Sequence, residues 1–301
     1  MNPPEGGKPK RSFLKGFIIL LALSLLFVLL VMIIPFGADS DDATFTIGKD
    51  KIGVVEVFGP ITGADSTVRQ IEKYAKDSSI KGILVHIDSP GGAVAPSQEI
   101  YEALLKARKK KKVVASMATL AASGGFYIAV GADRIVANPG TITGSIGVIM
   151  GFADVRKLMS KLGVESIVVK SGQFKDIGTS ARPFTDADRE MLEGVIDDVY
   201  MQFVAAVAKQ RHMEISKVKK IADGRIFSGR QGKELGMVDQ LGTFRDAVKL
   251  LASLTGITGE PVLVREREKF SWLKQILDSR LGWFWKNAPF TGPGLYYLWT
   301  L

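Results

Sequence analysis

From residue 51 onward, the chain alternates between short apolar runs and longer stretches in which apolar residues recur at helical spacing. The apolar runs predict strands at 52–57, 82–87, 113–116, 134–137 and 165–170. The helical spacing predicts helices at 67–76, 97–108, 126–130, 154–162, 185–209 and 244–254. Strands and helices that take turns in this way predict an α/β layer fold with a largely parallel sheet.

The longest predicted helix begins at a capping box, in which Thr185 caps the first turn and Asp188 stands three residues later. One face of this helix is apolar, which predicts either a contact with the core or an oligomer interface. The residues of this face are Met191, Ile196, Val199, Phe203 and Val207.

An apolar segment, residues 16–36, lies ahead of the alternating region, and its one polar side chain is Ser24. The segment has 21 residues, and about 20 are needed to cross a hydrocarbon core. The apolar region of a cleavable signal is shorter, and Pro35 to Asp39 make a poor cleavage site. The segment therefore predicts an uncleaved anchor, with the positively charged arm before it in the cytoplasm and the rest outside.

The chain divides accordingly into five parts. A basic cytoplasmic arm (1–12) precedes the transmembrane anchor (13–36), and an acidic linker (37–49) follows it. The α/β domain occupies residues 50–255, and an aromatic-rich C-terminal tail occupies residues 256–301.

The composition excludes several classes of catalytic and metal-binding site. With no cysteine in the chain, thiolate catalysis, disulfides and cysteine–metal sites are excluded. With only His86 and His212, a histidine-rich metal site is excluded as well. The formal net charge is +9, and the densest basic run, residues 106–112, ends a predicted helix. Cations there suit the helix dipole and solvent, so the run does not indicate nucleic-acid binding.

Three polar or glycine-rich loops, at 88–94, 119–125 and 171–178, each follow a predicted strand. Because parallel strands end at the same edge of a sheet, such loops present their groups together. The first loop offers backbone N–H donors, the second the hydroxyl of Ser123 and the third the amine of Lys175. Ser123 stands among small residues on a strand-to-helix turn, where a substrate can approach and N–H groups can face an oxyanion.

A serine needs a base to act as a nucleophile. His86 lies within a predicted strand, as a core histidine does, and His212 lies at the end of a helix, so neither follows a strand. The remaining candidate is a lysine, since Ser–Lys pairs are a variant of the serine triad. Lys175 can act only in its neutral form, so Asp176 must point away from it, and Lys170 is a competing candidate.

Several motifs stand in an order that resembles signal peptide peptidase A in its short bacterial form, over residues 50–255 together with the anchor. The motifs are Asp88-Ser89-Pro90-Gly91-Gly92, Ala122-Ser123-Gly124-Gly125-Phe126-Tyr127, Gly144-Ser145-Ile146-Gly147-Val148, Lys175-Asp176, Ala222-Asp223-Gly224-Arg225, Ser228-Gly229 and Leu235-Gly236-Met237-Val238-Asp239.

The resemblance implies a ClpP/crotonase-like fold of repeated β-β-α units and a serine endopeptidase with a Ser–Lys dyad, needing no metal or other cofactor. Ser123 would be the nucleophile, Lys175 the general base, and Ser145 the residue that orients the lysine amine. The amide groups of Gly92 and Gly124 would form the oxyanion hole.

Members of this family degrade remnant signal peptides after their release from preproteins. The resemblance thus implies peptide substrates, a single-pass location in the bacterial inner membrane with a periplasmic catalytic domain, and a homo-oligomer whose protomers share active sites. Two other interpretations stay open: a crotonase-like acyl-CoA enzyme and a non-catalytic membrane-tethered scaffold. The anchor and the Ser–Lys pair argue against the acyl-CoA enzyme.

The tail beyond Arg265 places many aromatic residues among prolines and glycines. One interpretation is that it packs on a neighbouring subunit or at the membrane surface. The other is that it occupies the substrate groove and is trimmed by the enzyme itself. The residues concerned are Trp272, Trp283, Phe284, Trp285, Tyr296, Tyr297, Leu298 and Trp299.

Overall fold

The structure is a computed structural model that describes residues 20–21, 23–24, 26, 50–266 and 296–298. The chain separates into two units, Met1–Gly48 and Lys49–Leu301. In the first unit the five described residues are helical and exposed, and the rest of the predicted anchor lies outside the described residues. Among the helices that the structure describes, none has the length and apolar character needed to cross a membrane.

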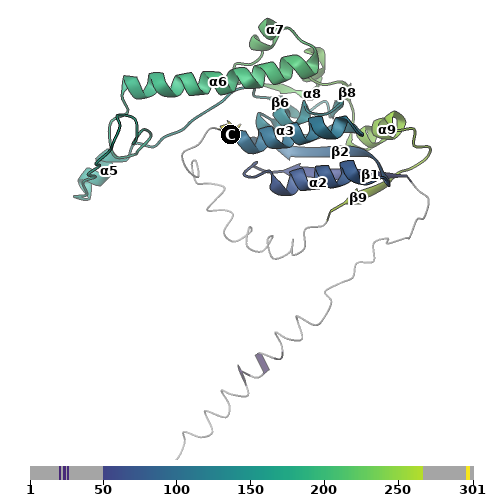
Figure 1. Ribbon diagram of the computed structural model, residues 1–301, viewed down its shortest axis with the longest axis horizontal. Coiled ribbons are helices and arrows are strands. Elements are labelled where there is room, and N and C mark those ends of the chain that lie inside the picture. The colour runs from purple at the N-terminus through teal and green to yellow at the C-terminus, as the bar shows by residue number, and fades with distance from the viewer. Residues whose placement is uncertain (1–19, 22, 25, 27–49, 267–295, 299–301) are drawn as a thin grey trace, which may run out of the picture. The chain divides into compact units, whose positions relative to one another are not determined.

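The second unit is built on an eight-stranded sheet (Figure 1). The strand order is β7-β6-β4-β2-β1-β9, with β5 beside β4 and β8 beside β5. All pairs are parallel except β6 with β7, so the predicted parallel sheet is confirmed. The strands are β1 (Lys51–Phe58), β2 (Ile80–Ser89), β4 (Lys112–Ala122), β5 (Arg134–Ala137), β6 (Ile142–Gly144), β7 (Ile226–Ser228), β8 (Gln240–Leu241) and β9 (Val262–Arg265).

Helices cover both faces of this sheet. Alternate residues of β1 face opposite sides, as the pleat requires. Ile52 and Val54 pack with α9, whereas Val55 and Val57 belong to the larger core shared with α2, α3, α4 and α6. The helices are α2 (Asp65–Lys76), α3 (Val94–Arg108), α4 (Gly124–Ala129), α5 (Arg156–Lys161), α6 (Asp186–Arg211), α7 (Ile215–Lys219), α8 (Gly229–Glu234) and α9 (Phe244–Leu254).

The predicted capping box of α6 is present, because Thr185 Oγ1 accepts a hydrogen bond from the Asp188 N–H and the Asp188 carboxylate accepts one from the Thr185 N–H. The C-terminal half of the helix enters the core, where Phe203 and Val207 are fully buried. At the N-terminal end, Met191 and Ile196 remain partly exposed. The predicted core contact is thus confirmed for one half of the helix.

The predicted strand at 165–170 is wrong. These residues form no regular structure and are exposed, Ile167 by 88% and Val169 by 98% of their surfaces. They belong to a segment of residues 151–184, here called the arm, which contains α5 and stands at the N-terminal end of α6 (Figure 1). The local apolar pattern favours a strand, but among the described residues no strand edge pairs with it, and an isolated strand is not stable.

The contact between Gly53 of β1 and Tyr74 of α2 tests the packing of the core. A Cβ atom on Gly53 would lie 2.5 Å from the Tyr74 ring, so Gly53→Ala is expected to lower the free energy of unfolding by about 1–3 kcal/mol. Gly194, which is exposed on α6 with no atom within 4 Å of such a Cβ, provides the control. Gly194→Ala is expected to raise that free energy by up to about 1 kcal/mol. The free energies of unfolding of both variants are measured by urea denaturation. Equal values would contradict the close contact between Gly53 and Tyr74.

Candidate active site

Ser123 stands at the junction of β4 and α4 in a backbone conformation that few residues adopt. Its φ is 54° and its ψ is −117°, and its N–H donates to the carbonyl oxygen of Gly144 at 2.8 Å. A non-glycine residue keeps such a conformation only where the surrounding structure imposes it, and such residues cluster at functional sites. The Ser123 hydroxyl makes no hydrogen bond to a described residue, although the residue is 99% buried.

Ser145 lies beside Ser123 because the strands that precede them are neighbours. β4 and β6 are parallel, with Ala122 opposite Gly144, so the residues after each strand leave the sheet at the same edge. Ser145 also has a positive φ, 49°, and its N–H donates to the carbonyl oxygen of Arg225 at 2.8 Å. Both serines line one cavity of about 400 Å³. The structure therefore brings together two of the predicted site residues.

The two glycines predicted to form an oxyanion hole also meet here. β2 ends at Ser89, and the chain turns into a short strand, β3 (Gly91–Ala93), which lies against the turn after Ser123. A Cβ atom on Gly91 would be 2.6 Å from the Gly124 nitrogen, and one on Gly124 would be 3.2 Å from the Gly92 nitrogen. Only residues without side chains allow this approach, so the two amides lie near each other and next to the serine.

A strand from the C-terminal tail runs along these glycines. β10 (Tyr296–Leu298) pairs antiparallel with β3, and on its other edge Tyr296 exchanges two backbone hydrogen bonds of 3.1 Å with Ile149. Leu298 lines the cavity that contains Ser123. Three residues of the tail thus lie extended across the site, with hydrogen bonds on both edges. The other tail residues, at 267–295 and 299–301, lie outside the described residues.

Tyr297 anchors this strand. Its side chain is fully buried, its ring stacks on Tyr127 at 5.2 Å, and it packs against Phe203 at 4.8 Å between centroids. The Tyr297 hydroxyl donates to the carbonyl oxygen of Val199 at 3.1 Å, and burial raises the pKa of this phenol. A Cβ atom on Gly91 would be 2.0 Å from the Tyr297 carbonyl oxygen. The tail therefore fills an aromatic pocket and places a peptide carbonyl beside the glycine turn.

Lys175 does not join this arrangement in the described chain. It lies on the arm, its side chain is exposed, and it is not among the residues that line the Ser123 cavity. The predicted meeting of three loops is therefore wrong for the third loop within one chain. The physical reason is that the strand expected to deliver this loop to the sheet edge does not form, so no strand pairing among the described residues holds the loop at the ends of β2 and β4.

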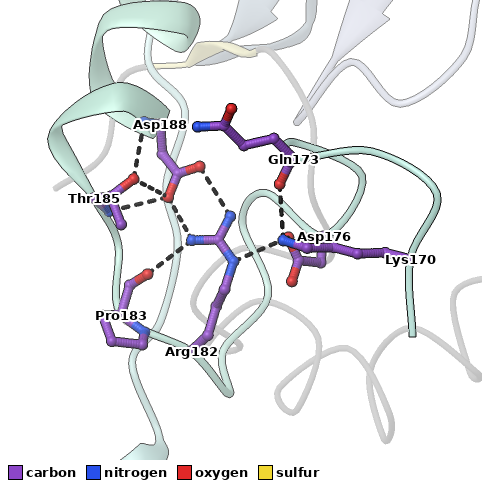
Figure 2. A network of polar contacts seen from close by, with 7 residues as sticks. All are labelled: Lys170, Gln173, Asp176, Arg182, Pro183, Thr185 and Asp188. Atoms are coloured by element: carbon purple, nitrogen blue, oxygen red, sulfur yellow. Dashed lines mark hydrogen bonds and ion pairs between the residues drawn. The ribbon is translucent and has the colours of Figure 1, made fainter. Parts of the chain in front are cut away.

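The Asp176 carboxylate is engaged by cations other than Lys175, in agreement with the expectation that it does not face that amine. Its carboxylate accepts a hydrogen bond from Lys170 Nζ at 2.7 Å and forms an ion pair with Arg182 Nε at 3.0 Å (Figure 2). The hydrogen bond from Lys170 and the charge of Arg182 lower the pKa of the Asp176 carboxyl group. Lys170, the competing candidate for the base, is thus engaged with a carboxylate.

His86 is packed among aromatic rings, in agreement with its predicted structural role. It makes edge-to-face contacts with Phe58 and Phe244, at 5.3 and 4.7 Å between ring centroids, and burial lowers its pKa. His212 ends α6 with a positive φ of 53°. Neither histidine lines the Ser123 cavity, and the described residues contain no group of acidic or histidine side chains able to hold a metal ion.

Comparison with known families decides the assignment. The model of Peptidase family S49 matches residues 106–258, which is half of the chain and includes Ser123, Ser145 and Lys175. The chain belongs to peptidase family S49. The Clp protease model matches residues 55–140, in agreement with the mixed α/β architecture.

Relatives carry names that agree with family S49. A protein of Synechocystis sp., provisionally named a protease, is 46% identical over 72% of this chain and 79% of its own length. A protein of Enterococcus faecium, provisionally named signal peptide peptidase SppA, is 34% identical over 70% of this chain and 62% of its own. Protease 4 of Salmonella typhi is 37% identical over 73% of this chain but only 35% of its own. The chain is thus a serine peptidase of the SppA type.

The sequence analysis missed Arg182 and did not single out Tyr297 among the aromatic residues of the tail. Arg182 sits in a polar stretch before α6, and its only signal is that it precedes the capping box of that helix. Tyr297 is one of many aromatic residues in the tail, and nothing in its local sequence distinguishes it from Tyr296. The role of each residue becomes visible only in the structure, from the groups that its side chain contacts.

The close approach at Gly92 generates a test of the site. A Cβ atom on Gly92 would lie 2.1 Å from the backbone oxygen of Ile61, so Gly92→Ala must displace β3 from the turn that follows Ser123. Peptidase activity on an unstructured peptide is expected to fall by at least about 100-fold, the effect of losing one oxyanion donor. The control is Gly63→Ala, because no atom lies within 4 Å of a Cβ there. Equal activity in the two variants would show that Gly92 has no role in the active site.

Proposed function

We propose that this chain is a membrane-anchored endopeptidase that degrades remnant signal peptides by means of a Ser123–Lys175 dyad. The observation that carries the proposal is the extended strand β10 lying across the glycine turn beside Ser123. A peptidase must bind its substrate extended, with a carbonyl near a nucleophile and near amide donors. The aromatic, fully buried surroundings of Tyr297 suit apolar peptides of the kind found in signal sequences.

The proposed reaction needs only side chains and backbone amides. Lys175 takes the proton of the Ser123 hydroxyl as its oxygen attacks a peptide carbonyl. The amides of Gly92 and Gly124 stabilise the oxyanion that develops, while the hydroxyl of Ser145 orients the lysine amine. The lysine then returns the proton to the leaving amine, and water, activated by the same amine, releases the acyl group from Ser123.

A neighbouring subunit supplies Lys175 in this proposal. Lys175 does not line the cavity that contains Ser123, and the arm that carries it has apolar side chains that the described chain leaves exposed. Its exposed side chains are Leu158, Leu162, Val164, Ile167, Val168 and Val169. Full burial of an exposed apolar side chain is worth about 1.5–3 kcal/mol, and these side chains, which are between 49% and 98% exposed, would gain from about half to nearly all of that. A second copy is the occupant that both covers this surface and brings the amine to a serine, so the active enzyme is a homo-oligomer.

The location proposed is the bacterial inner membrane, with the N-terminus in the cytoplasm and the catalytic domain in the periplasm. Its support is the sequence of residues 1–36, in which a basic arm precedes an apolar stretch of spanning length. Such a location places the catalytic domain near signal peptides left in the membrane after cleavage.

Mixing two inactive variants tests the sharing of sites between subunits. Ser123→Ala and Lys175→Ala are each expected to be inactive, because one lacks the nucleophile and the other the base. After equal amounts are dissociated and reassembled together, about a quarter of the interfaces carry both intact residues, so about a quarter of the parental activity is expected to return. Peptide cleavage is the measurement. No recovery, in mixed oligomers verified by mass spectrometry, would contradict shared sites.

The position of β10 predicts that the enzyme trims its own tail. The Tyr297 carbonyl lies beside the glycine turn and Leu298 lines the Ser123 cavity, so the parent is expected to end at or near Tyr297. Ser123→Ala is expected to keep the full mass, and intact mass spectrometry measures both. Ser160→Ala, an exposed serine of α5, serves as the control and is expected to be trimmed like the parent. Identical masses for the parent and Ser123→Ala would exclude trimming.

A further inference from the structure

A network of charged side chains fixes the loop that carries Lys175. Lys170 Nζ donates to the Gln173 carbonyl oxygen at 2.8 Å and to the Asp176 carboxylate, which closes the loop on itself (Figure 2). Within the loop, the Lys175 N–H donates to the Gly172 carbonyl oxygen at 3.2 Å. The backbone of Lys175 therefore lies inside a turn whose two ends are joined by one ammonium group.

Arg182 joins this loop to the start of α6. Its Nε forms the ion pair with Asp176 at 3.0 Å, while its two terminal nitrogens donate to the two oxygens of Asp188. Asp188 is 98% buried and also accepts hydrogen bonds from the N–H and hydroxyl of Thr185. Figure 2 shows the guanidinium group between the two carboxylates. One planar cation thus connects a carboxylate of the Lys175 loop with the capping-box carboxylate, Asp188, in the first turn of a long helix.

The charges of this network balance. Two cations, Lys170 and Arg182, face two carboxylates, Asp176 and Asp188. Both cations lie within ion-pair distance of Asp176, so its carboxylate is engaged by groups other than the adjacent amine. Among the described residues, no carboxylate forms an ion pair with Lys175. A free carboxylate on the next residue would favour the protonated amine, which cannot accept a proton.

We propose that Arg182 is a positioning residue for Lys175: it holds the Asp176 carboxylate away from the amine and fixes the loop on α6. This inference rests on the proposed role of Lys175 as the base. Loss of Arg182 leaves Asp176 with Lys170 as its one cation, so the carboxylate is held less firmly and more of its negative charge acts on the neighbouring ammonium. The protonated form of Lys175 is then favoured, and the enzyme needs a higher pH to work.

Other charged groups around the network are already paired. The cavity next to Arg182 is also lined by Asp154, Arg189 and Glu193, which come from the arm and from α6. Asp154 accepts three hydrogen bonds from Arg156, and Arg189 lies 3.8 Å from Glu193. Among the described residues that line this cavity, no unpaired cation could take the place of Arg182 beside Asp176. The effect of Arg182 on the loop therefore acts through Asp176.

The test is the pH dependence of kcat/KM for cleavage of an unstructured peptide by the full-length enzyme. In Arg182→Gln the midpoint of the rise with pH is expected to move up by about one pH unit, with about tenfold lower kcat/KM below the parental midpoint. In Arg182→Gln combined with Asp176→Asn, the midpoint is expected to return to the parental value, because no carboxylate remains to be released. A purely structural role of Arg182 would lower the rate without moving the midpoint.

Two further variants serve as controls. Arg189→Gln removes the same charge from an exposed position of α6, and its midpoint is expected to equal that of the parent. Arg182→Lys keeps one cation near Asp176 but loses the fork that reaches Asp188, so a smaller upward shift is expected. If Arg182→Gln does not fold, as judged by circular dichroism, the shift must appear in Arg182→Lys. A parental midpoint in the folded Arg182 variant, or a shift that persists in the double variant, overturns the inference.

A second measurement separates this inference from the proposed dyad. In the Ser123→Ala background, acylation of the Lys175 amine by acetic anhydride is followed against pH by peptide mass spectrometry. The midpoint of this labelling is expected to rise in Arg182→Gln whether or not Lys175 is the base. If labelling shifts while Lys175→Ala keeps its peptidase activity, the dyad is wrong and the role of Arg182 at the amine stands. An unshifted labelling midpoint overturns the role itself.

Discussion

The close approach of four backbone segments around Ser123 is the constraint on which the site depends. β3 must lie against the turn after β4, against the segment at Ile61 and against the tail strand at once, and any side chain at Gly91 or Gly92 would collide with backbone atoms. Ser123 keeps its positive φ at this contact, where its N–H donates to the Gly144 carbonyl oxygen at the end of β6. The orientation of the serine is therefore a result of packing across three neighbouring strands and is not a local preference of the turn.

Much of this arrangement follows from the sequence. The apolar runs at β2 and β4 are long and continuous, as strands buried on both faces are, and glycines with small residues mark the turns after them. Because the strands are parallel and adjacent, the residues after them must share an edge, which is enough to bring Ser123 near the glycine amides. The place of Ser145 follows from the same rule once β6 is known to pair with β4.

The arm and the tail could not be predicted in this way, because their positions depend on contacts distant in sequence. Residues 165–170 have the composition of a strand, yet no strand edge in the described part of the chain pairs with them, so local propensity predicts the wrong element. Tyr297 has the same local sequence signals as its aromatic neighbours. It is buried against Tyr127 and Phe203, which are distant from it along the sequence. The role of Arg182 likewise depends on its contacts with Asp176 and Asp188, which the sequence alone does not predict.

The tail strand is bonded along both edges, by β3 on one side and by Ile149 on the other. A peptide that takes the same place must give up every internal hydrogen bond over these residues, which a helix or a sheet strand within a folded domain cannot do without unfolding. Under the proposed function, the backbone conformation of a peptide would thus decide whether it binds before any of its side chains is recognised. Under the proposed function, a folded protein would be protected by its own secondary structure, while loose chain ends and unfolded fragments would fit.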